Sequence, residues 1–281
     1  MSRRKGRKLD GWLLIDKPAG PTSADVVNKL RWAYGAAKAG HGGTLDPAAT
    51  GLLVLAFGEA TKCLASMDHA LKTYRFMVRF GAETSTDDAE GAVLATSDVR
   101  PSDTDIELAL AAFRGHIQQI PPQVSAVKVD GERAYDLARE GIQMELKSRP
   151  LWVERLVIVG RPDADHVELE MICGKGGYVR AIARDLGRAL GTLGHALWLR
   201  RTAVGPFDLA QALMFAGSAE APQDEALLPL EAALPDNERL DVTSEQAKDI
   251  SHGRRILGFP GKTWAAHKGQ AIALGHIEGA E

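Results

Sequence analysis

One stretch of the chain reads Gly40-His41-Gly42-Gly43-Thr44-Leu45-Asp46-Pro47-Ala48-Ala49-Thr50-Gly51. Its glycines permit positive φ angles or the close approach of another backbone. Pro47 has a fixed φ and pushes Asp46 toward an extended conformation, so Asp46 is kept out of a helix. The apolar run that follows, 52–57, is typical of a buried strand. The pattern predicts a rigid loop that presents one carboxylate, and the simplest alternative is a turn that Asp46 only caps.

The composition is that of an ordinary globular protein. The 281 residues are 45% hydrophobic and 25% charged, which suits one large domain or one domain with a small addition. No stretch approaches the roughly 20 apolar residues of a membrane span. The basic segment 2–8 is not followed by an apolar run, so it does not match a secretory signal. Cys63 and Cys173 predict no disulfide framework, and we expect a cytoplasmic protein without membrane association.

The net charge of −3 argues against a nonspecific polyanion binder but leaves room for a local basic face. Basic residues gather in four places: Arg3 to Lys8, Arg180 with Arg184 and Arg188, Arg200-Arg201, and Arg254-Arg255. Acidic residues gather in 83–90 and 224–241. The simplest interpretation of any one cluster is solvated surface. The acidic segment 81–91 is expected to be a loop, and it lacks the ligand pattern of an EF-hand.

A second glycine-rich stretch reads Cys173-Gly174-Lys175-Gly176-Gly177-Tyr178-Val179-Arg180 and leads into a predicted helix over 181–190. Such a junction can bind a phosphate on the helix N-terminal amides. However, the glycine spacing of neither a dinucleotide fold nor a P-loop is present. Gly261-Lys262-Thr263 also fails as a P-loop, because Ile256 stands where a glycine is needed. Nucleotide binding is therefore not predicted.

Periodicity predicts a chain of mixed helices and strands. Expected strands cover 11–18, 52–57, 72–80, 124–129, 151–159, 166–173, 193–204 and part of 250–281, and Tyr74 shares a face with Phe76 and Val78. Expected helices follow Thr22 or Ser23 and cover 103–113, 135–141 and 181–190, and another starts near Thr243. The segment 115–122 is expected to be a loop that two prolines end.

Several of these motifs, in order along residues 10–205, resemble those of the bacterial tRNA pseudouridine synthase B family. The stretch around Asp46 resembles the signature that carries the catalytic aspartate of the family. Lys72-Thr73-Tyr74-Arg75 resembles a second motif, whose tyrosine reaches the target base. The stretch 175–180 resembles a Lys-Gly-Thr-Tyr-Ile-Arg-like motif, although Gly177 stands where threonine is usual and Gly174 where serine is usual. Two further motifs are similar, Lys17-Pro18 and Trp198-Leu199-Arg200-Arg201-Thr202.

The resemblance implies roles for individual residues. Asp46 would be catalytic, and Arg180 would keep it ionised and orient it. Tyr74, Tyr178 and Leu199 would contact a flipped-out uracil, Tyr74 would also be a candidate for removing the C5 proton, and His41 would enter the space that the base leaves. RNA-backbone contacts are expected from basic side chains, namely Lys17, Lys128, Arg133, Arg139, Arg200 and Arg201; for Lys17 a structural role is the alternative, and for 128, 133 and 139 a solvated surface.

The resemblance also implies an α+β architecture. Residues 1–215 would form a pseudouridine-synthase-like catalytic domain, with a large mixed, mostly antiparallel sheet flanked by helices. An RNA-clamping insertion would lie at about 121–149. Residues 216–240 would be a linker, and 241–281 would form a short, β-rich, PUA-like RNA-binding domain.

The implied reaction is the isomerisation of uridine 55 in the T-loop of tRNA to pseudouridine. It involves no redox change and no external atom, so no cofactor and no metal are expected. The expected partner is the T-arm stem-loop, bound by a monomer without an obligatory protein partner. The sequence leaves open whether Asp46 attacks the sugar C1′ or the base C6, or helps to abstract a sugar proton.

Three other functions are weighed against this one. An RNA-guided ribosomal-RNA pseudouridine synthase shares the motifs. A noncatalytic chaperone that folds tRNA would need a basic face but not Asp46. A glycoside hydrolase would need a second carboxylate in a matching context, and the sequence shows none.

Overall fold

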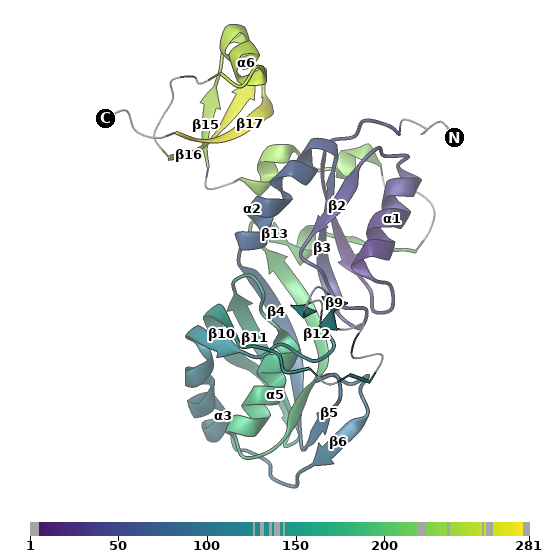
Figure 1. Ribbon diagram of the computed structural model, residues 1–281, viewed down its shortest axis with the longest axis vertical. Coiled ribbons are helices and arrows are strands. Elements are labelled where there is room, and N and C mark those ends of the chain that lie inside the picture. The colour runs from purple at the N-terminus through teal and green to yellow at the C-terminus, as the bar shows by residue number, and fades with distance from the viewer. Residues whose placement is uncertain are drawn as a thin grey trace.

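The computed structural model describes residues 6–125, 127–129, 132–134, 137, 141–142, 144–217, 223–234, 237–254, 256 and 261–277. Its largest element is a 10-stranded mixed sheet (Figure 1). The strands are β1 (Gly11–Lys17), β2 (Ala39–Gly42), β3 (Thr50–Phe57), β4 (Lys72–Phe80), β7 (Gly115–Gln119), β10 (Arg149–Asp163), β11 (His166–Cys173), β12 (Gly194–Val204), β13 (Phe207–Asp208) and β14 (Leu213–Met214). Their order is β14-β1-β3-β12-β4-β11-β10-β7, with β2 on β3 and β13 on β12. Within this sheet, the parallel pairs are β1–β14 and β3–β12 and the other pairs are antiparallel, which confirms the predicted mostly antiparallel sheet.

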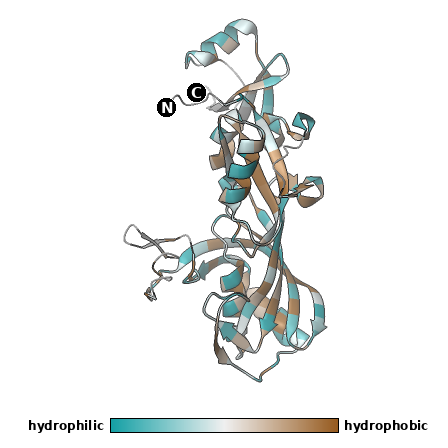
Figure 2. Ribbon diagram, turned by 90° about the vertical axis from the view of Figure 1, so that its right-hand side faces the viewer, coloured by the Kyte–Doolittle hydropathy of each residue, from teal (hydrophilic) through white to brown (hydrophobic). Residues whose placement is uncertain are grey.

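Helices cover the sheet where their apolar faces meet it. The first, α1 (Ser23–Ala33), begins at a capping box formed by Thr22 and Asp25, and buries Val26, Val27 and Leu30 against β1 and β3. The helices α3 (Asp103–Leu110) and α5 (Val179–Ala189) bury their apolar residues against β4, β10 and β11. Smaller helices are η1 (Gly58–Cys63), α2 (Leu64–His69), η2 (Ala111–Phe113) and η3 (Leu209–Gln211). In Figure 2 the hydrophobic residues concentrate in the strands of the large sheet.

The junction of β3 and β12 brings together the residues singled out in the sequence. β12 pairs with β4 from Gly194 to Val204, but it meets β3 only at Arg200–Thr50 and Arg201–Gly51. The end of the 40–51 stretch is therefore bonded directly to the strand that carries Leu199. The start of α5 lies close by, because α5 packs on β12 and β4. Residues from four separate elements converge at this point.

Several sequence-based expectations were wrong in this part of the chain. Residues 115–119 form strand β7 rather than a loop, since they pair with β10 from Gln119–Arg149 to Gly115–Val153. The acidic segment starts with a strand, β5 (Ala82–Thr84), which pairs with β6 (Val93–Thr96). Of the strand expected over 124–129, only β8 (Lys128–Val129) forms, paired with β9 (Glu132–Arg133). Most of the helix expected over 135–141 lies outside the described residues.

Residues 223–234, which lie within the segment expected to be a linker, pack on the large sheet. Trp12 in β1 exchanges backbone hydrogen bonds with Leu228 at 2.8 and 2.9 Å, and its indole Nε1 donates to Leu230 O at 3.0 Å. Two short helices flank this contact, η4 (Asp224–Ala226) and η5 (Leu230–Ala233). Residues 223–234 therefore belong to the core around β1.

A small unit follows at one end of the molecule (Figure 1). It contains β15 (Glu238–Asp241), β16 (Gly261–His267) and β17 (Gln270–Ile277) in one sheet, together with α6 (Ser244–Ser251). Thr243 caps α6, as its sequence predicted. None of the helices in the described ranges has the length and apolar character needed to cross a membrane.

Candidate active site

A pocket lies where the 40–51 stretch, β4, β12 and the start of α5 meet. Five of the residues singled out in the sequence line it: Asp46, Tyr74, Tyr178, Arg180 and Leu199. The rest of the lining is small or apolar, and it consists of Thr44, Leu45, Ala49, Gly177 and Val179. One carboxylate, one guanidinium and two phenols thus face a space with largely apolar walls.

The predicted contact between Asp46 and Arg180 is present. Nη2 of Arg180 donates to Oδ2 of Asp46 at 2.7 Å. The Arg180 side chain is 6% exposed, whereas that of Asp46 is 47% exposed. The guanidinium therefore lies behind the carboxylate and leaves it accessible to a molecule in the pocket. A charge-assisted hydrogen bond of this length orients the carboxylate.

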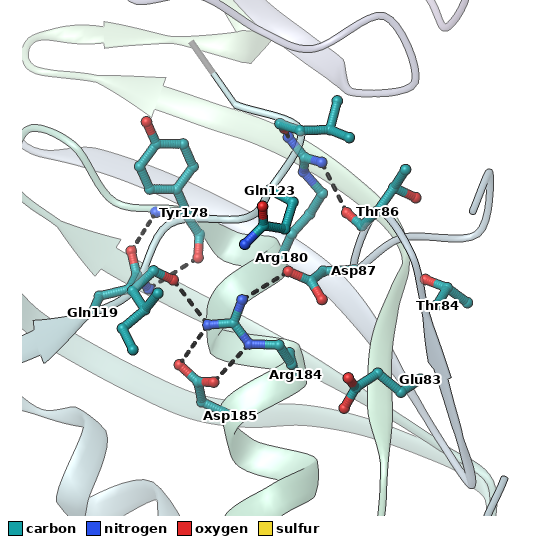
Figure 3. Close-up of polar contacts among 12 residues, drawn as sticks. Glu83, Thr84, Thr86, Asp87, Gln119, Gln123, Tyr178, Arg180, Arg184 and Asp185 are labelled. Carbon is teal, nitrogen blue, oxygen red and sulfur yellow. Dashed lines mark hydrogen bonds and ion pairs between the residues drawn. The ribbon is translucent and has the colours of Figure 1, made fainter. Parts of the chain in front are cut away.

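Arg180 is itself held by acceptors from two other segments. Nη1 donates to Thr86 O at 2.9 Å and to Asp88 Oδ2 at 3.2 Å, and Nη2 donates to Val124 O at 2.9 Å (Figure 3 shows the Thr86 contact). With Asp46, the guanidinium has acceptors from three loops. Its position is consequently fixed before any substrate binds.

The loop that carries Asp46 is tied down by buried polar side chains. Nζ of Lys17 donates to the carbonyls of Pro18, Pro47 and Ala49 at 2.8, 3.1 and 2.7 Å. Burial lowers the pKa of the Lys17 ammonium to about 8, and the negative charge of Asp46 opposes this shift. The contacts with Pro47 and Ala49 fix the backbone that follows the catalytic candidate.

Ser23 holds the same loop from α1. Its hydroxyl Oγ accepts from Leu45 N at 2.9 Å and lies 3.0 Å from Leu45 O, to which it donates. A serine at the start of a helix is therefore used here to fix the residue just before Asp46.

Arg201 holds the loop from β12. Its Nε donates to Leu52 O at 2.8 Å, and its Nη2 donates to Gly43 O at 3.0 Å. Gly51 lies directly against the Arg201 backbone at φ +100°, where an added Cβ would come within 2.2 Å of Arg201 O. Of the glycines in the 40–51 stretch, only Gly43 and Gly51 have a positive φ.

The predicted RNA-backbone contacts of Lys17 and Arg201 are wrong. Lys17 is 0% and Arg201 1% exposed, and both side chains bind backbone carbonyls inside the protein. Arg200 is partly exposed and pairs with Asp16 at 2.5 Å, so its RNA contact stays a prediction. The side chains of Lys128 and Arg133 and the whole of Arg139 lie outside the described part of the chain.

The two phenols in the pocket stay protonated at neutral pH. Burial raises the pKa of Tyr74, which the Arg201 guanidinium opposes, and burial also raises the pKa of Tyr178, which Arg149 opposes. Tyr178 is fixed at the start of α5, because its N donates to Gln119 Oε1 at 2.9 Å and its O accepts from Gln119 Nε2 at 3.0 Å (Figure 3). Both hydroxyls can therefore donate hydrogen bonds to a polar group in the pocket.

His41 lies outside the pocket lining. It is in β2, opposite Leu55 of β3. Burial lowers its pKa, the positive charge of Arg201 adds to the shift, and the ring is neutral at physiological pH. Its Nδ1 is buried without a hydrogen-bond partner among the described residues. The predicted entry of His41 into the space left by a flipped base stays a prediction.

Comparison of the chain with known proteins identifies its family. The model for the N-terminal domain of TruB family pseudouridylate synthases matches residues 31–179. The chain belongs to this family. A model for the C-terminal domain of tRNA pseudouridylate synthase B matches residues 180–235. Two curated TruB relatives, each called tRNA pseudouridine synthase B, match almost the whole chain. That of Cereibacter sphaeroides is 57% identical over 99% of this chain and 96% of its own length, and that of Ruegeria pomeroyi is 53% identical over 99% and 95%.

Solved structures confirm the expected pseudouridine-synthase-like fold. A chain in the crystal structure of a Cbf5-Nop10-Gar1 complex matches with a TM-score of 0.72 and 24% identity, covering 95% of this chain and 78% of its own. A chain in the structure of an H/ACA RNP bound to a substrate RNA containing 2′-deoxyuridine matches with a TM-score of 0.71 and 22% identity, over 95% and 77%.

Gly177 stands where the resemblance led us to expect threonine, and the structure gives a reason. A Cβ at this position would lie 2.7 Å from Sγ of Cys173, which is buried beneath it. Burial raises the pKa of the Cys173 thiol to about 12, so the sulfur is a neutral packing group. A threonine does not fit at 177 unless Cys173 moves.

Sequence reasoning missed the acidic residues that support this TruB site. Asp87 and Asp88 were interpreted as solvated loop, but Asp87 is 7% exposed and Asp88 binds Arg180. Arg184, one helical turn after Arg180, is also buried and pairs with Asp87 at 2.8 Å. The available signal was the spacing itself, since arginines four residues apart share a helix face and require buried acidic partners if that face is covered.

A glycoside hydrolase finds little support at this site. Asp88 is a second carboxylate near Asp46, but it is bound to Arg180 and does not line the pocket, so it is not placed as the second acid of a glycoside hydrolase. Across the described ranges, no three His, Cys, Asp or Glu side chains gather closely enough to hold a metal ion.

Proposed function

We propose that this protein converts uridine 55 in the T-loop of tRNA to pseudouridine, with Asp46 as the catalytic carboxylate. The observation that carries the proposal is the 2.7 Å contact of Asp46 with the buried Arg180 at the edge of a pocket lined by two phenols. The relatives called tRNA pseudouridine synthase B, 53–57% identical to this chain, support tRNA as the substrate.

The chemistry places demands that these residues meet. The bond between the sugar C1′ and the base N1 breaks, the uracil turns within the pocket, and C5 bonds to C1′. The C5 proton is released to solvent and N1 takes up a proton, so the product is an isomer of the substrate. Asp46 attacks C1′ or C6, or assists removal of a sugar proton, and each of these roles needs an ionised and oriented carboxylate. Arg180 orients the carboxylate through its contact with Oδ2.

The detached uracil has to be retained while it turns. Before the reaction, the target base has to leave its stack in the RNA helix or loop in order to enter the pocket. Tyr74 and Tyr178 offer aromatic faces and neutral hydroxyls to such a base, and Leu199 offers an apolar contact. These side chains can hold a flat polar ring without bonding it so specifically that rotation is prevented.

We propose that one chain performs this reaction without a guide RNA or protein partner. The catalytic unit would begin near residue 1 and, because residues 223–234 pack on β1, extend to about residue 234. The small sheet that follows, with α6, would add RNA-binding surface.

Tritium release from C5-labelled uridine tests the function. The purified protein is given a bare T-arm stem-loop labelled only at position 55, and a matched stem-loop labelled at another loop uridine serves as control. We expect close to one tritium released per stem-loop with the first RNA and none with the second. Release that requires an added guide RNA or a second protein would contradict the proposal, and so would equal release from both RNAs.

A further inference from the structure

Helix α5 carries two buried arginines on the same face. Arg180 and Arg184 are four residues apart, so their side chains lie one above the other. Their side chains are only 6% and 8% exposed. Arg180 touches the catalytic candidate Asp46, whereas Arg184 is not part of the pocket lining.

The two arginines bind the same pair of segments, and Figure 3 shows the contact of Arg180 with Thr86 and that of Arg184 with Asp87. Arg180 binds Thr86 O and Asp88 in the 84–88 loop and Val124 O in the 120–124 segment. Arg184 binds Asp87 in the first segment, Nη1 to Oδ2 at 2.8 Å, and Ile120 O in the second, Nη2 to O at 2.8 Å. Arg184 therefore repeats, one turn further along the helix, the contacts that fix Arg180.

Asp87 is the residue that lets one short loop serve both arginines. It has a φ of +59°, a left-handed conformation that a non-glycine residue seldom adopts. Its N donates to Thr84 O at 3.2 Å, and its O accepts from Ala196 N in β12 at 3.0 Å. In this conformation its carboxylate turns to Arg184, while the neighbours on either side, Thr86 O and Asp88, turn to Arg180.

The charges require this arrangement to stay intact. A buried guanidinium or carboxylate that loses its partner is left as an uncompensated charge in a poorly solvated place. Arg184 also binds Asp185 through Nε at 2.8 Å, which holds the guanidinium plane in one orientation. The Asp87–Arg184 contact thus restrains the 84–88 loop in the position in which Thr86 O and Asp88 bind Arg180.

We propose that Arg184 and Asp87 form a positioning pair for the active site. They hold the 84–88 loop where Thr86 O and Asp88 lock the Arg180 guanidinium against Asp46, without touching the substrate themselves. This inference rests on the proposed function, in which Arg180 has to orient Asp46. Losing the pair slows the chemical step and leaves RNA affinity nearly unchanged.

Asp87→Asn tests the proposal, because it is nearly isosteric but removes the buried negative charge that pairs with the Arg184 guanidinium. Arg184→Lys is the second variant. It keeps the positive charge, but an ammonium cannot donate to Asp87, Ile120 O and Asp185 from one position. Arg188→Gln is the matched control, because Arg188 joins the same helix to Glu83 at 2.7 Å, next to the same loop, and its side chain is 52% exposed. Single-turnover tritium release, RNA Kd and thermal unfolding are measured for each.

We expect Asp87→Asn and Arg184→Lys to lower the single-turnover rate by about tenfold to a hundredfold, the scale of an ångström-sized misplacement of a catalytic group. Their Kd values should stay within about twofold of the native value, and Arg188→Gln should keep a near-native rate. A folded Asp87→Asn protein with the native rate, or with no greater loss than Arg188→Gln, would overturn the proposal.

A crystal structure of the folded Asp87→Asn protein gives a readout that does not depend on activity. We expect the 2.7 Å contact between Arg180 Nη2 and Asp46 Oδ2 to be lost or lengthened beyond hydrogen-bond distance. An unchanged contact would contradict the inference. If the native protein releases no tritium, the proposed function fails, while this structure still decides whether the pair positions Arg180.

Discussion

Nη2 of Arg180 and Oδ2 of Asp46 lie 2.7 Å apart, although 134 positions separate the two residues in the chain. Each partner is anchored on its own side. Arg180 is bound by Thr86, Asp88 and Val124, and the loop of Asp46 is bound by Lys17 and Arg201. Because neither anchor passes through the pocket, a base can enter without disturbing the pair.

Replacing Arg180 by lysine keeps the charge but should not keep the activity. An ammonium is a point charge, and it cannot reach Thr86 O, Asp88, Val124 O and Asp46 from one position as the guanidinium does. We expect Arg180→Lys to lower the single-turnover rate about a hundredfold. Arg155→Lys, on the exposed pair of β10 with Glu170, is the control and should behave as native. Near-native turnover by Arg180→Lys would show that the shape of the guanidinium is unimportant.

The buried Lys17 predicts a loss of activity at alkaline pH. As the pH rises through the pKa of about 8, the ammonium becomes an amine with two N–H groups for three carbonyl acceptors, and the Asp46 loop is held less firmly. The single-turnover rate should therefore fall above about pH 8. A pH–rate profile of native protein measures this, and the fall should be absent from the profile of Lys17→Met, whose overall rate is low throughout.

The same group should affect folding stability in the opposite direction. The unfolded lysine keeps its proton up to its ordinary pKa of 10.5, so between about 8 and 10.5 the folded state binds fewer protons than the unfolded state. The Lys17 contribution to the free energy of unfolding therefore rises with pH in that window. Urea unfolding at several pH values separates the two effects. A rate that falls only in step with stability would refute the assignment of the alkaline limb to Lys17.

Gly51 should be intolerant of any side chain. At φ +100° its Cβ would be strained, and it would also lie 2.2 Å from Arg201 O in the backbone of β12. Gly51→Ala should cost about 1–2 kcal/mol for the conformation and about 1–3 kcal/mol for the overlap. Gly191→Ala is the control, because Gly191 has φ +69° but nothing within 4 Å, so only the conformational cost applies. Equal losses in urea unfolding for the two variants would contradict the close packing of Gly51 on Arg201.

Elements with local signals could be predicted from the sequence. Thr22 and Thr243 predict the starts of their helices, because a capping side chain binds a backbone N–H within three residues. The alternation of Tyr74, Phe76 and Val78 predicts β4. The meeting of Asp46 with Arg180 is different. No local pattern links two residues so far apart, and only the resemblance to a family brought them together.

The residues that were misjudged owe their roles to distant partners. The family resemblance implied RNA contacts for Arg201 and, beside a structural role, for Lys17, but each side chain meets carbonyls that only the fold supplies. Asp87 and Asp88 look like solvated acids until α5 places two arginines beside them. The segment 115–119 becomes a strand because it pairs with β10, and its own sequence of polar residues before two prolines does not predict this.

The most direct measurement compares Asp46→Asn with native protein in single-turnover tritium release from a T-arm stem-loop labelled at uridine 55. Asparagine keeps the shape of the side chain but removes its charge, so the RNA Kd should remain within about threefold, since Asp46 makes no attractive charge contact with phosphates. If the carboxylate lowers the activation free energy by ~6 kcal/mol, its loss should reduce the rate by about four decades. A folded Asp46→Asn protein that releases tritium within about tenfold of the native rate would contradict the account, because that is less than ~1.4 kcal/mol.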